Sequence, residues 1–314
     1  MYKYKITVFT PTYNRAHTLK NAYESLKNQT FSKSDFEWLI VDDGSDDETE
    51  SLVKEFVGEE KDRLDGESLN IRYVYKKNGG KHTAINKGVV ESDGELFFIL
   101  DSDDALAPNS LTVVEDEWKK IKDKEKFFGI VGLCTYPNGE VIGTTLPEDT
   151  DAGALGVGFN FVDLYFKLGV RGDKTIAFTT EVLKKFPFPE RDGIRFLPES
   201  VVWHEMSKYY SVKTVNEPMI VREYLDDGLT KNIMSENSIK GIAFEYFLLI
   251  DQNTYPFAKY PKRWLLNYMN LSRYSLLSGS KYFGELKGIK NKLMYVLMYP
   301  LGYVKYAKQK KEVH

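Results

Sequence analysis

Residues 95–104 of this chain read Glu95-Leu96-Phe97-Phe98-Ile99-Leu100-Asp101-Ser102-Asp103-Asp104. An unbroken run of five apolar residues is typical of a strand that is buried on both faces of a sheet. Three carboxylates follow within four positions, where the strand is expected to leave the sheet. In open α/β sheets, ligands bind outside the carboxyl ends of the strands. This stretch therefore predicts an α/β fold with an acidic binding site at one edge of its sheet.

The carboxylates of Asp101, Asp103 and Asp104 allow two interpretations. Carboxylates this close together repel one another unless a cation lies among them, and hard cations such as Mg²⁺ take carboxylate oxygens together with a substrate's phosphates. The alternative is a solvated turn that caps a helix beginning near Pro108, because short acidic motifs recur freely. The sequence around the cluster has to decide between a metal site and a turn.

The first hundred residues alternate between strands and helices. Besides the run before Asp101, strands are expected at residues 4–10, 36–41 and 71–75. A helix is expected after each of them, and Ser45 and Asp46 are suitable N-cap residues for the second helix. Pro11 has a fixed φ and no N–H, so we expect the first strand to end there. This alternation predicts a parallel sheet with right-handed crossovers.

Three polar loops follow these strands, at residues 10–15, 42–45 and 78–82. Because the carboxyl ends of parallel strands share an edge, we expect the loops to meet at the acidic cluster, as in a nucleotide site. Asp42 could accept an N–H from a base edge, or could belong to a turn and cap. Gly80 and Lys81 could lie against phosphates, or could form a plain loop. The spacing is not that of a Walker A loop, and no GxGxxG motif follows the first strand.

The composition is that of a soluble globular protein of one large or two ordinary domains, with 314 residues, 42% apolar and 28% charged. The single cysteine, Cys134, excludes an internal disulfide and a cysteine-based zinc site. No signal peptide and no run of 18 apolar residues is found, so we expect a cytoplasmic protein. Residues 236–314 carry a net charge of +8 and residues 1–235 carry −11. A basic, aromatic tail suggests an anionic surface as a partner.

The four loops together resemble those of family-2 glycosyltransferases with the GT-A fold, the bacterial enzymes that build capsule, exopolysaccharide and O-antigen chains. The motifs that carry the resemblance are Thr10-Pro11-Thr12-Tyr13-Asn14, Val41-Asp42-Asp43-Gly44-Ser45, Asn78-Gly79-Gly80-Lys81-His82 and Asp101-Ser102-Asp103-Asp104. The resemblance is strong over residues 1–110 and looser over 110–230. It implies a mixed, mainly parallel sheet flanked by helices, with a C-terminal helical region. It also favours a metal site over a solvated turn at Asp103.

The resemblance implies a role for each matching residue of the donor site. Pro11, Tyr13 and Asp42 would hold the uracil and ribose of a UDP-sugar, and Asp103 would bind Mn²⁺ or Mg²⁺ bridging the diphosphate. Asp101 would lie near the ribose or the metal. The remaining donor-site residues of the matching motifs are Thr10, Gly80, Lys81 and Ser102.

The resemblance also implies a general base for inverting transfer, which takes the proton from the attacking acceptor hydroxyl. Glu199 in Pro198-Glu199-Ser200 fits best, although Ser200 replaces the commoner second acid, and Asp192 is the alternative. The other interpretation of Glu199 is a carboxylate favoured by a helix N-terminus. His204 could approach the metal or could simply pack beside Trp203.

Two more polar segments of the second half match the family loosely. Asp173 could bind a sugar hydroxyl or lie in a turn. Residues 222–230, with Gly228, resemble a lid that closes over the donor and excludes water.

We expect a catalytic domain at residues 1–235, with a nucleotide-sugar half (1–105) and an acceptor half (106–235), and a helical, basic and aromatic region at 236–314. The region 236–314 could lie in the headgroup layer of an anionic inner membrane. Alternatively, it could pack on the catalytic domain or on a second subunit in a homodimer. The acceptor would be a saccharide, lipid-linked at the inner leaflet, in surface polysaccharide biosynthesis. No nucleic-acid partner is expected.

Two other functions remain as alternatives. A sugar-1-phosphate nucleotidyltransferase would need a glycine-rich loop after the first strand, and residues 10–15 contain no glycine. A non-catalytic carbohydrate- or lipid-binding module would have no need of Asp101, Asp103 and Glu199.

Overall fold

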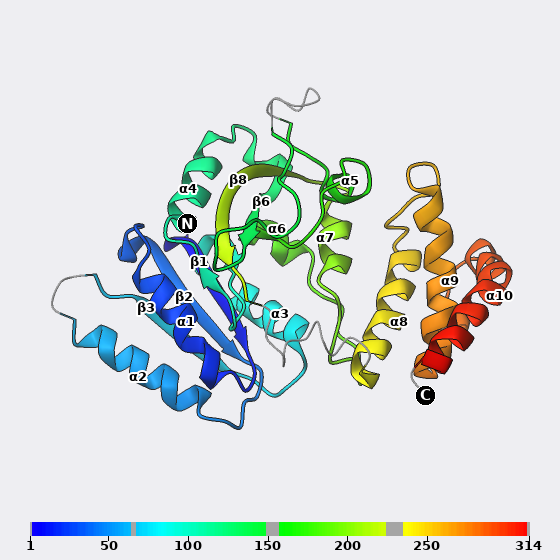
Figure 1. Cartoon of the computed structure of the whole chain (residues 1–314), viewed down its shortest axis with the longest axis horizontal. Coiled ribbons are helices and arrows are strands. Elements are labelled where there is room, and N and C mark those ends of the chain that lie inside the picture. Colours follow the sequence, from blue (N-terminus) through cyan, green and yellow to red (C-terminus); the bar gives the residue numbers. More distant parts are fainter. Residues whose placement is uncertain (1, 64–66, 149–156, 224–234, 313–314) are drawn as a thin grey trace. The chain divides into compact units, whose positions relative to one another are not determined.

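The computed structural model of the chain describes residues 2–63, 67–148, 157–223 and 235–312. Two compact units are formed (Figure 1). The first comprises residues 1–188 and 206–225, and the second comprises residues 189–205 and 226–314. The lid expected around Gly228 lies outside the described residues.

The first unit is built on one eight-stranded sheet with the strand order β3-β2-β1-β4-β7-β6-β8-β5. The strands are β1 (Tyr4–Thr12), β2 (Phe36–Asp42), β3 (Asn70–Tyr75), β4 (Gly94–Ile99), β5 (Ala105–Leu106), β6 (Phe127–Thr135), β7 (Lys174–Thr179) and β8 (Ser211–Val221). β1 to β4 are parallel, β6 and β8 are parallel, and β7 is antiparallel to both of its neighbours. The predicted mixed, mainly parallel sheet is confirmed.

Helices cover both faces of this sheet (Figure 1). They are α1 (Ala16–Lys27), α2 (Thr49–Lys61), α3 (Lys81–Glu91), α4 (Ser110–Lys120), α5 (Phe161–Phe166) and α6 (Thr180–Lys185). Successive side chains of β1 point to opposite faces of the sheet. Val8 lies in the core cluster with α1, α2 and α4, whereas the ring of Phe9 lies against Gly88 of α3. Burial on both faces explains why residues 96–100 are apolar without interruption.

The expectation that Pro11 ends the first strand is wrong. β1 continues to Thr12, with Pro11 opposite Val41 of β2. The carbonyl of Phe9 faces the β4 side, where it accepts the N–H of Leu100, so Pro11 faces that side too. Pairing of β1 with β4 stops at Phe9, and the N–H that Pro11 lacks therefore breaks no ladder hydrogen bond.

The expected capping of α2 by Ser45 and Asp46 is also wrong. The N-cap position is Glu48, and the first N–H of the helix, that of Thr49, donates to Asp47 Oδ1 at 3.0 Å. Ser45 is used elsewhere, because its hydroxyl accepts the N–H of Asn14 at 2.8 Å. The side chain expected to start a helix instead ties two loops together.

The second unit is helical, as expected for residues 236–314. Its helices are α7 (Ser200–Met206, whose last residue belongs to the first unit), α8 (Glu236–Asp251), α9 (Pro261–Ser278) and α10 (Ile289–Glu312). α9 packs against both α8 and α10, begins with a proline and ends at Gly279 with a left-handed φ of 70°. Among the described residues, no helix combines the length and the apolarity needed to cross a membrane.

Candidate functional site

The first two loops at the carboxyl edge of the sheet are tied together by hydrogen bonds. Besides the bond to Ser45, the side-chain oxygen of Asn14 accepts the N–H of Asp46 at 2.9 Å. Asn14 has a φ of 53°, a conformation that asparagine tolerates better than most residues. Next to it, Tyr13 leaves about half of its side chain exposed, so an aromatic ring is available at this edge.

Asp43 joins the second loop to the third. Its carboxylate accepts the N–H groups of Gly79 at 3.0 Å and Gly80 at 2.7 Å, and the ammonium of Lys76 at 2.5 Å. Gly80 has a φ of 96°, which a residue with a Cβ rarely adopts. These bonds fix the backbone that leads into α3.

Asp42 is almost fully buried and its two oxygens are used within the protein. Oδ1 accepts the N–H of Ser45 at 2.7 Å, and Oδ2 accepts the hydroxyl of Tyr73 at 2.6 Å. Burial and this carboxylate raise the pKa of Tyr73, which keeps the phenol a donor. Thr10 is likewise buried, and its hydroxyl accepts the indole N–H of Trp38 at 2.9 Å.

Lys81, the first residue of α3, joins the third loop to the acidic cluster. Its ammonium lies 2.6 Å from Asp101 Oδ1. Burial raises the pKa of Asp101, but Lys81 and Arg222 outweigh it and hold the pKa below its usual value. All four loops expected to converge are therefore linked in one series of contacts, which confirms that part of the prediction.

Arg222 organises the other side of the cluster. It directly follows β8, whose Val221 pairs with Ala105 of β5 and so brings Arg222 to the acidic loop. The guanidinium donates to both oxygens of Asp104, the shortest contact being 2.6 Å, and to Asp173 at 2.8 Å. Such a forked contact has the geometry of the strong arginine–carboxylate pairs. Asp173, considered above for a sugar hydroxyl or a turn, thus lies in an ion pair.

Asp103 stands between these two cation-bound carboxylates. Burial and the charge of Asp101 raise its pKa, while Arg15 and Lys81 act in the opposite direction. Within the described ranges, no three His, Cys, Asp or Glu side chains are placed to hold a metal by themselves. Mg²⁺ sites that use one or two carboxylates plus substrate phosphates need no such group, and a partly buried carboxylate repelled by its neighbour suits that arrangement. Ser102 is buried beside it.

The residues expected for proton transfer lie in the second unit. The backbone carbonyl of Glu199 accepts the N–H groups of Val202 and Trp203 at the start of α7. The next residue, Ser200, donates to Glu245 Oε1 of α8 at 3.0 Å. Burial raises the pKa of Glu245 to about 7, and the Ser200 hydroxyl acts against this. A carboxyl group that titrates near neutral pH thus lies beside the predicted base motif.

His204, the third expected metal ligand, shares a hydrogen bond of 2.5 Å between its Nδ1 and the Tyr255 hydroxyl. Burial, with a smaller contribution from Arg263, lowers the pKa of His204 to about 4. A neutral imidazole packed against a tyrosine matches the packing interpretation, whereas the metal role stays a prediction.

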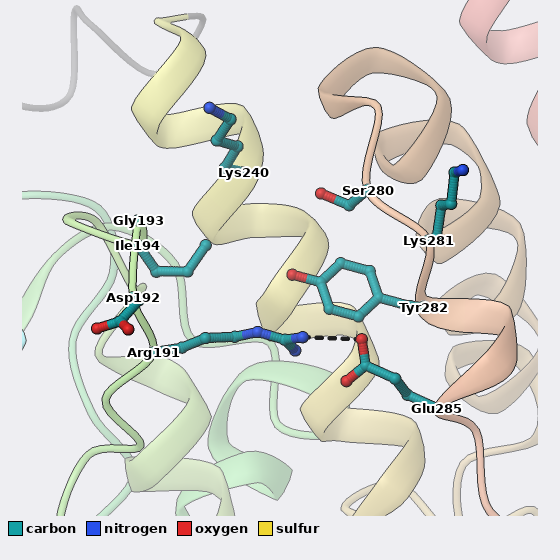
Figure 2. A pocket seen from close by; sticks show the side chains of 9 residues that line it. All are labelled: Arg191, Asp192, Gly193, Ile194, Lys240, Ser280, Lys281, Tyr282 and Glu285. Carbon is teal, nitrogen blue, oxygen red and sulfur yellow. Dashed lines mark hydrogen bonds and ion pairs between the residues drawn. The ribbon is translucent and has the colours of Figure 1, made fainter.

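Asp192, the alternative base, lines a pocket of about 290 Å³ in the second unit (Figure 2). Arg191 crosses this pocket, where it pairs with Glu285 at 2.8 Å and lies 5.2 Å from the centre of the Tyr282 ring. Figure 2 shows the Asp192 carboxylate pointing away from that ion pair. Its charge is therefore not used in the ion pair of Arg191 with Glu285.

Sequence reasoning missed the two side chains that define these electrostatics, Arg222 and Glu245. Arg222 was considered only as the start of a lid, because its partner Asp104 lies 118 positions away in the chain. Glu245 lies in an apolar helical segment. The one available signal was its position as a lone carboxylate in that segment, since buried acids require a partner.

Comparison with known proteins finds a glycosyltransferase family 2 domain within the first unit. The family model described as Glycosyl transferase family 2 matches residues 7–126. Poly(ribitol-phosphate) beta-N-acetylglucosaminyltransferase TarP of Staphylococcus aureus is 27% identical over 259 residues, which cover 79% of this chain and 70% of TarP. The GalNAc(5)-diNAcBac-PP-undecaprenol beta-1,3-glucosyltransferase of Campylobacter jejuni is 33% identical over 130 residues, covering 41% of this chain and 38% of that enzyme. The match to the second enzyme thus spans well under half of its length.

Two solved structures share the fold. TarS 1–349 of Staphylococcus aureus in complex with UDP-GlcNAc has a TM-score of 0.56 at 15% identity, over 94% of this chain and 79% of that one. The mannosyltransferase PcManGT of Pyrobaculum calidifontis, in complex with GDP-Man and Mn²⁺, has a TM-score of 0.53 at 16% identity, over 99% and 89%. The expected GT-A fold is confirmed.

Proposed function

We propose that this chain, a glycosyltransferase that carries a family 2 domain, transfers a hexosyl or N-acetylhexosaminyl group from a UDP-sugar to a saccharide hydroxyl. The observation that carries the proposal is the linkage of four loops around Asp103, from Asn14 through Asp43 and Lys81 to Asp101. Such a linkage fixes the site before substrate arrives, so that little binding energy is lost in ordering it.

In this proposal the donor lies over residues 1–105. Tyr13 and Pro11 contact the uracil. Asp42 accepts an N–H from the edge of the uracil, either directly after its hydrogen bond with the Tyr73 hydroxyl breaks, or through that hydroxyl. Lys81, or the backbone at Gly80, lies by the base and the ribose. TarS, which has a similar fold, holds UDP-GlcNAc and supports UDP as the nucleotide. PcManGT, also of similar fold, holds GDP-Man, so GDP is the alternative nucleotide.

Mn²⁺ or Mg²⁺ is the proposed cofactor, held by Asp103 and the diphosphate, with Asp101 or His204 as further candidate ligands. When bound, the ion offsets the negative charge that grows on the leaving diphosphate. Lys81 and Arg222 add positive charge at the same edge of the sheet and keep Asp101 ionised.

Glu199 is the proposed general base, with Asp192 as the alternative. It takes the proton of the acceptor hydroxyl while the oxygen attacks the anomeric carbon, so the configuration inverts in a single displacement. The acceptor binds to the acceptor half, residues 106–235. It is a lipid-linked saccharide used to assemble a surface polysaccharide, and the undecaprenol named for the Campylobacter relative supports this choice.

Thermal melting with UDP, GDP and cytidine nucleotides, each with and without Mn²⁺, tests the donor. UDP with Mn²⁺ should raise the free energy of unfolding by about 2.7 kcal/mol at a hundred times the dissociation constant. A shift with GDP alone would overturn the donor. No shift with any nucleotide would favour a non-catalytic binding module.

The base is tested by comparing Glu199→Gln with Asp192→Asn in a UDP-release assay with an accepted acceptor. Loss of a general base costs about 10²–10⁴-fold in kcat. We expect that loss for Glu199→Gln and near-normal turnover for Asp192→Asn, with unchanged UDP binding in both. The reverse pattern would assign the base to Asp192.

A further inference from the structure

The C-terminal helix α10 (Ile289–Glu312) has one face packed and one face open. Its packed face lies on α9, where a Cβ at Gly302 would overlap Ser272 Oγ at 1.8 Å, so the two helices approach closely. Figure 1 shows the two helices side by side. The open face is apolar, and each of the following side chains is more than half exposed: Ile289, Leu293, Val296, Leu297, Leu301 and Val304.

These six positions follow one another at intervals of three, four or one residue, so they form a single stripe along the helix. Single exposed apolar residues are ordinary, but a continuous stripe on a water-soluble surface marks a binding face. Tyr299 and Tyr303 are also exposed along this helix. The face is therefore apolar along most of its length and includes phenol groups, which favour the boundary between water and lipid.

The charges of α10 indicate what covers this face. The helix carries six lysines and a single acid, Glu312 at its end. Two lysines, Lys290 and Lys292, lie in its first turn, where Lys290 Nζ is 5.1 Å from the centre of the Trp264 ring of α9. Four more follow the apolar stripe: Lys305, Lys308, Lys310 and Lys311. A second copy of the chain docked by the same face in a two-fold contact would bring these lysines against their own kind, since such an interface is self-complementary. An anionic lipid surface has the opposite charge.

We propose that α10 docks in the plane of an anionic bilayer, with its apolar stripe at the level of the upper acyl chains and its lysines among the headgroup phosphates. Lysine stems are long enough to lie along apolar surface while the ammonium reaches the phosphates. The proposal does not depend on the donor or on the reaction, because it concerns the lipid surface alone.

Sedimentation of the full chain with vesicles tests this, using phosphatidylglycerol–phosphatidylcholine mixtures against pure phosphatidylcholine. We expect binding to the anionic vesicles and at least about tenfold weaker binding by Leu293→Glu/Leu297→Glu, because two charges then enter the apolar layer. Replacing Lys305 and Lys308 by Gln should weaken binding by about fivefold for each lysine. Val90→Glu, at an exposed apolar residue of α3, is the matched control and should bind as the parent does.

The oligomeric state of the same proteins is measured by light scattering without vesicles. Equal binding of the parent and the Leu293→Glu/Leu297→Glu variant to anionic vesicles would overturn the proposal, and so would binding that ignores lipid charge. A parent that ignores vesicles but forms dimers, which the variant abolishes, would assign the face to a second copy instead. Circular dichroism and melting show that each variant is folded.

Discussion

Two groups of side chains accommodate buried carboxylates in different ways: a first cluster of Asp101, Asp103 and Asp104 with their cations, and a second cluster of Glu245 with Ser200. In the first unit, Asp101 and Asp104 each have a cation at 2.6 Å, Lys81 for the former and Arg222 for the latter. In the second unit, Glu245 has the Ser200 hydroxyl at 3.0 Å. Although burial opposes it, the pKa of Asp101 is lowered, whereas burial raises the pKa of Glu245 to about 7. Lys81 and Arg222 keep Asp101 ionised, although burial still raises the pKa of Asp104 despite Arg222. A hydroxyl alone leaves Glu245 able to exchange a proton near neutral pH.

The comparison is tested most strongly at Asp103, the acidic residue between Asp101, which pairs with Lys81, and Asp104, which pairs with Arg222. Asp103→Ala should lower kcat by at least about 10³-fold, since a metal contributes several kcal/mol to stabilising a leaving diphosphate. Nucleotide release with Mn²⁺ is the measurement. Asp116→Ala, at an exposed acid of α4, is the control. Equal turnover by the Asp103 variant and its parent would exclude a metal role for this residue.

Arg222 should matter for folding as well as for the site. Arg222→Met removes the partner of Asp104, which is 3% exposed, and leaves that carboxylate buried. Burial and the neighbouring carboxylates already raise the pKa of Asp104 against the effect of Arg222. We expect the free energy of unfolding to fall by about 3 kcal/mol, measured by denaturant titration.

The double variant Asp104→Leu/Arg222→Met is the informative control for that loss. Replacing both partners of a buried ion pair by apolar residues is often neutral, so most of the stability should return. If the double variant is as unstable as Arg222→Met alone, the loss arises from packing or from the contact with Asp173 and not from an unpaired Asp104.

Glu245 should show the opposite dependence on pH from an ion-paired acid. Its pKa in the folded chain is about 7, above the ordinary value of 4.5. Its stabilising contribution is therefore complete below about pH 4.5 and is lost as the pH rises through 7. Glu245→Gln should not show this loss. The free energy of unfolding of the variant, relative to that of the parent, should therefore rise by about 2 kcal/mol between pH 5 and pH 8. Parallel stability profiles of the two proteins would mean that Glu245 does not titrate as stated.

The sequence was sufficient for the parts of the structure that follow from local pattern. Alternating strands and helices gave the parallel half of the sheet, and the polar loops at 10–15, 42–45 and 78–82 meet the acidic cluster as expected. Pro11 was misjudged because its effect depends on where pairing with β4 ends. Local pattern therefore predicts which edge of the sheet carries the site.

Long-range partners could not be obtained in this way. Arg222 meets Asp104 because β5 and β8 pair, and no motif near either residue encodes that pairing. Glu245 of α8 meets Ser200 of α7, a residue 45 positions away in the chain. The identity of a site residue can be read from its neighbours in the chain, but its protonation state depends on such partners.

The smallest expected effect is that of Ser200, and it separates hydrogen bonding from burial in the second cluster. Ser200→Ala removes the donor to Glu245 and should lower the free energy of unfolding by about 1 kcal/mol above pH 7, where the carboxylate is charged. Below pH 5 the loss should be smaller, because a protonated carboxyl needs that donor less. The pKa of Glu245, followed by NMR titration, should rise further, since the hydroxyl now lowers it. Ser34→Ala, at an exposed serine, should change neither quantity. An unchanged titration in Ser200→Ala would mean that burial alone sets the pKa of Glu245, and that the first cluster differs from the second by its cations only.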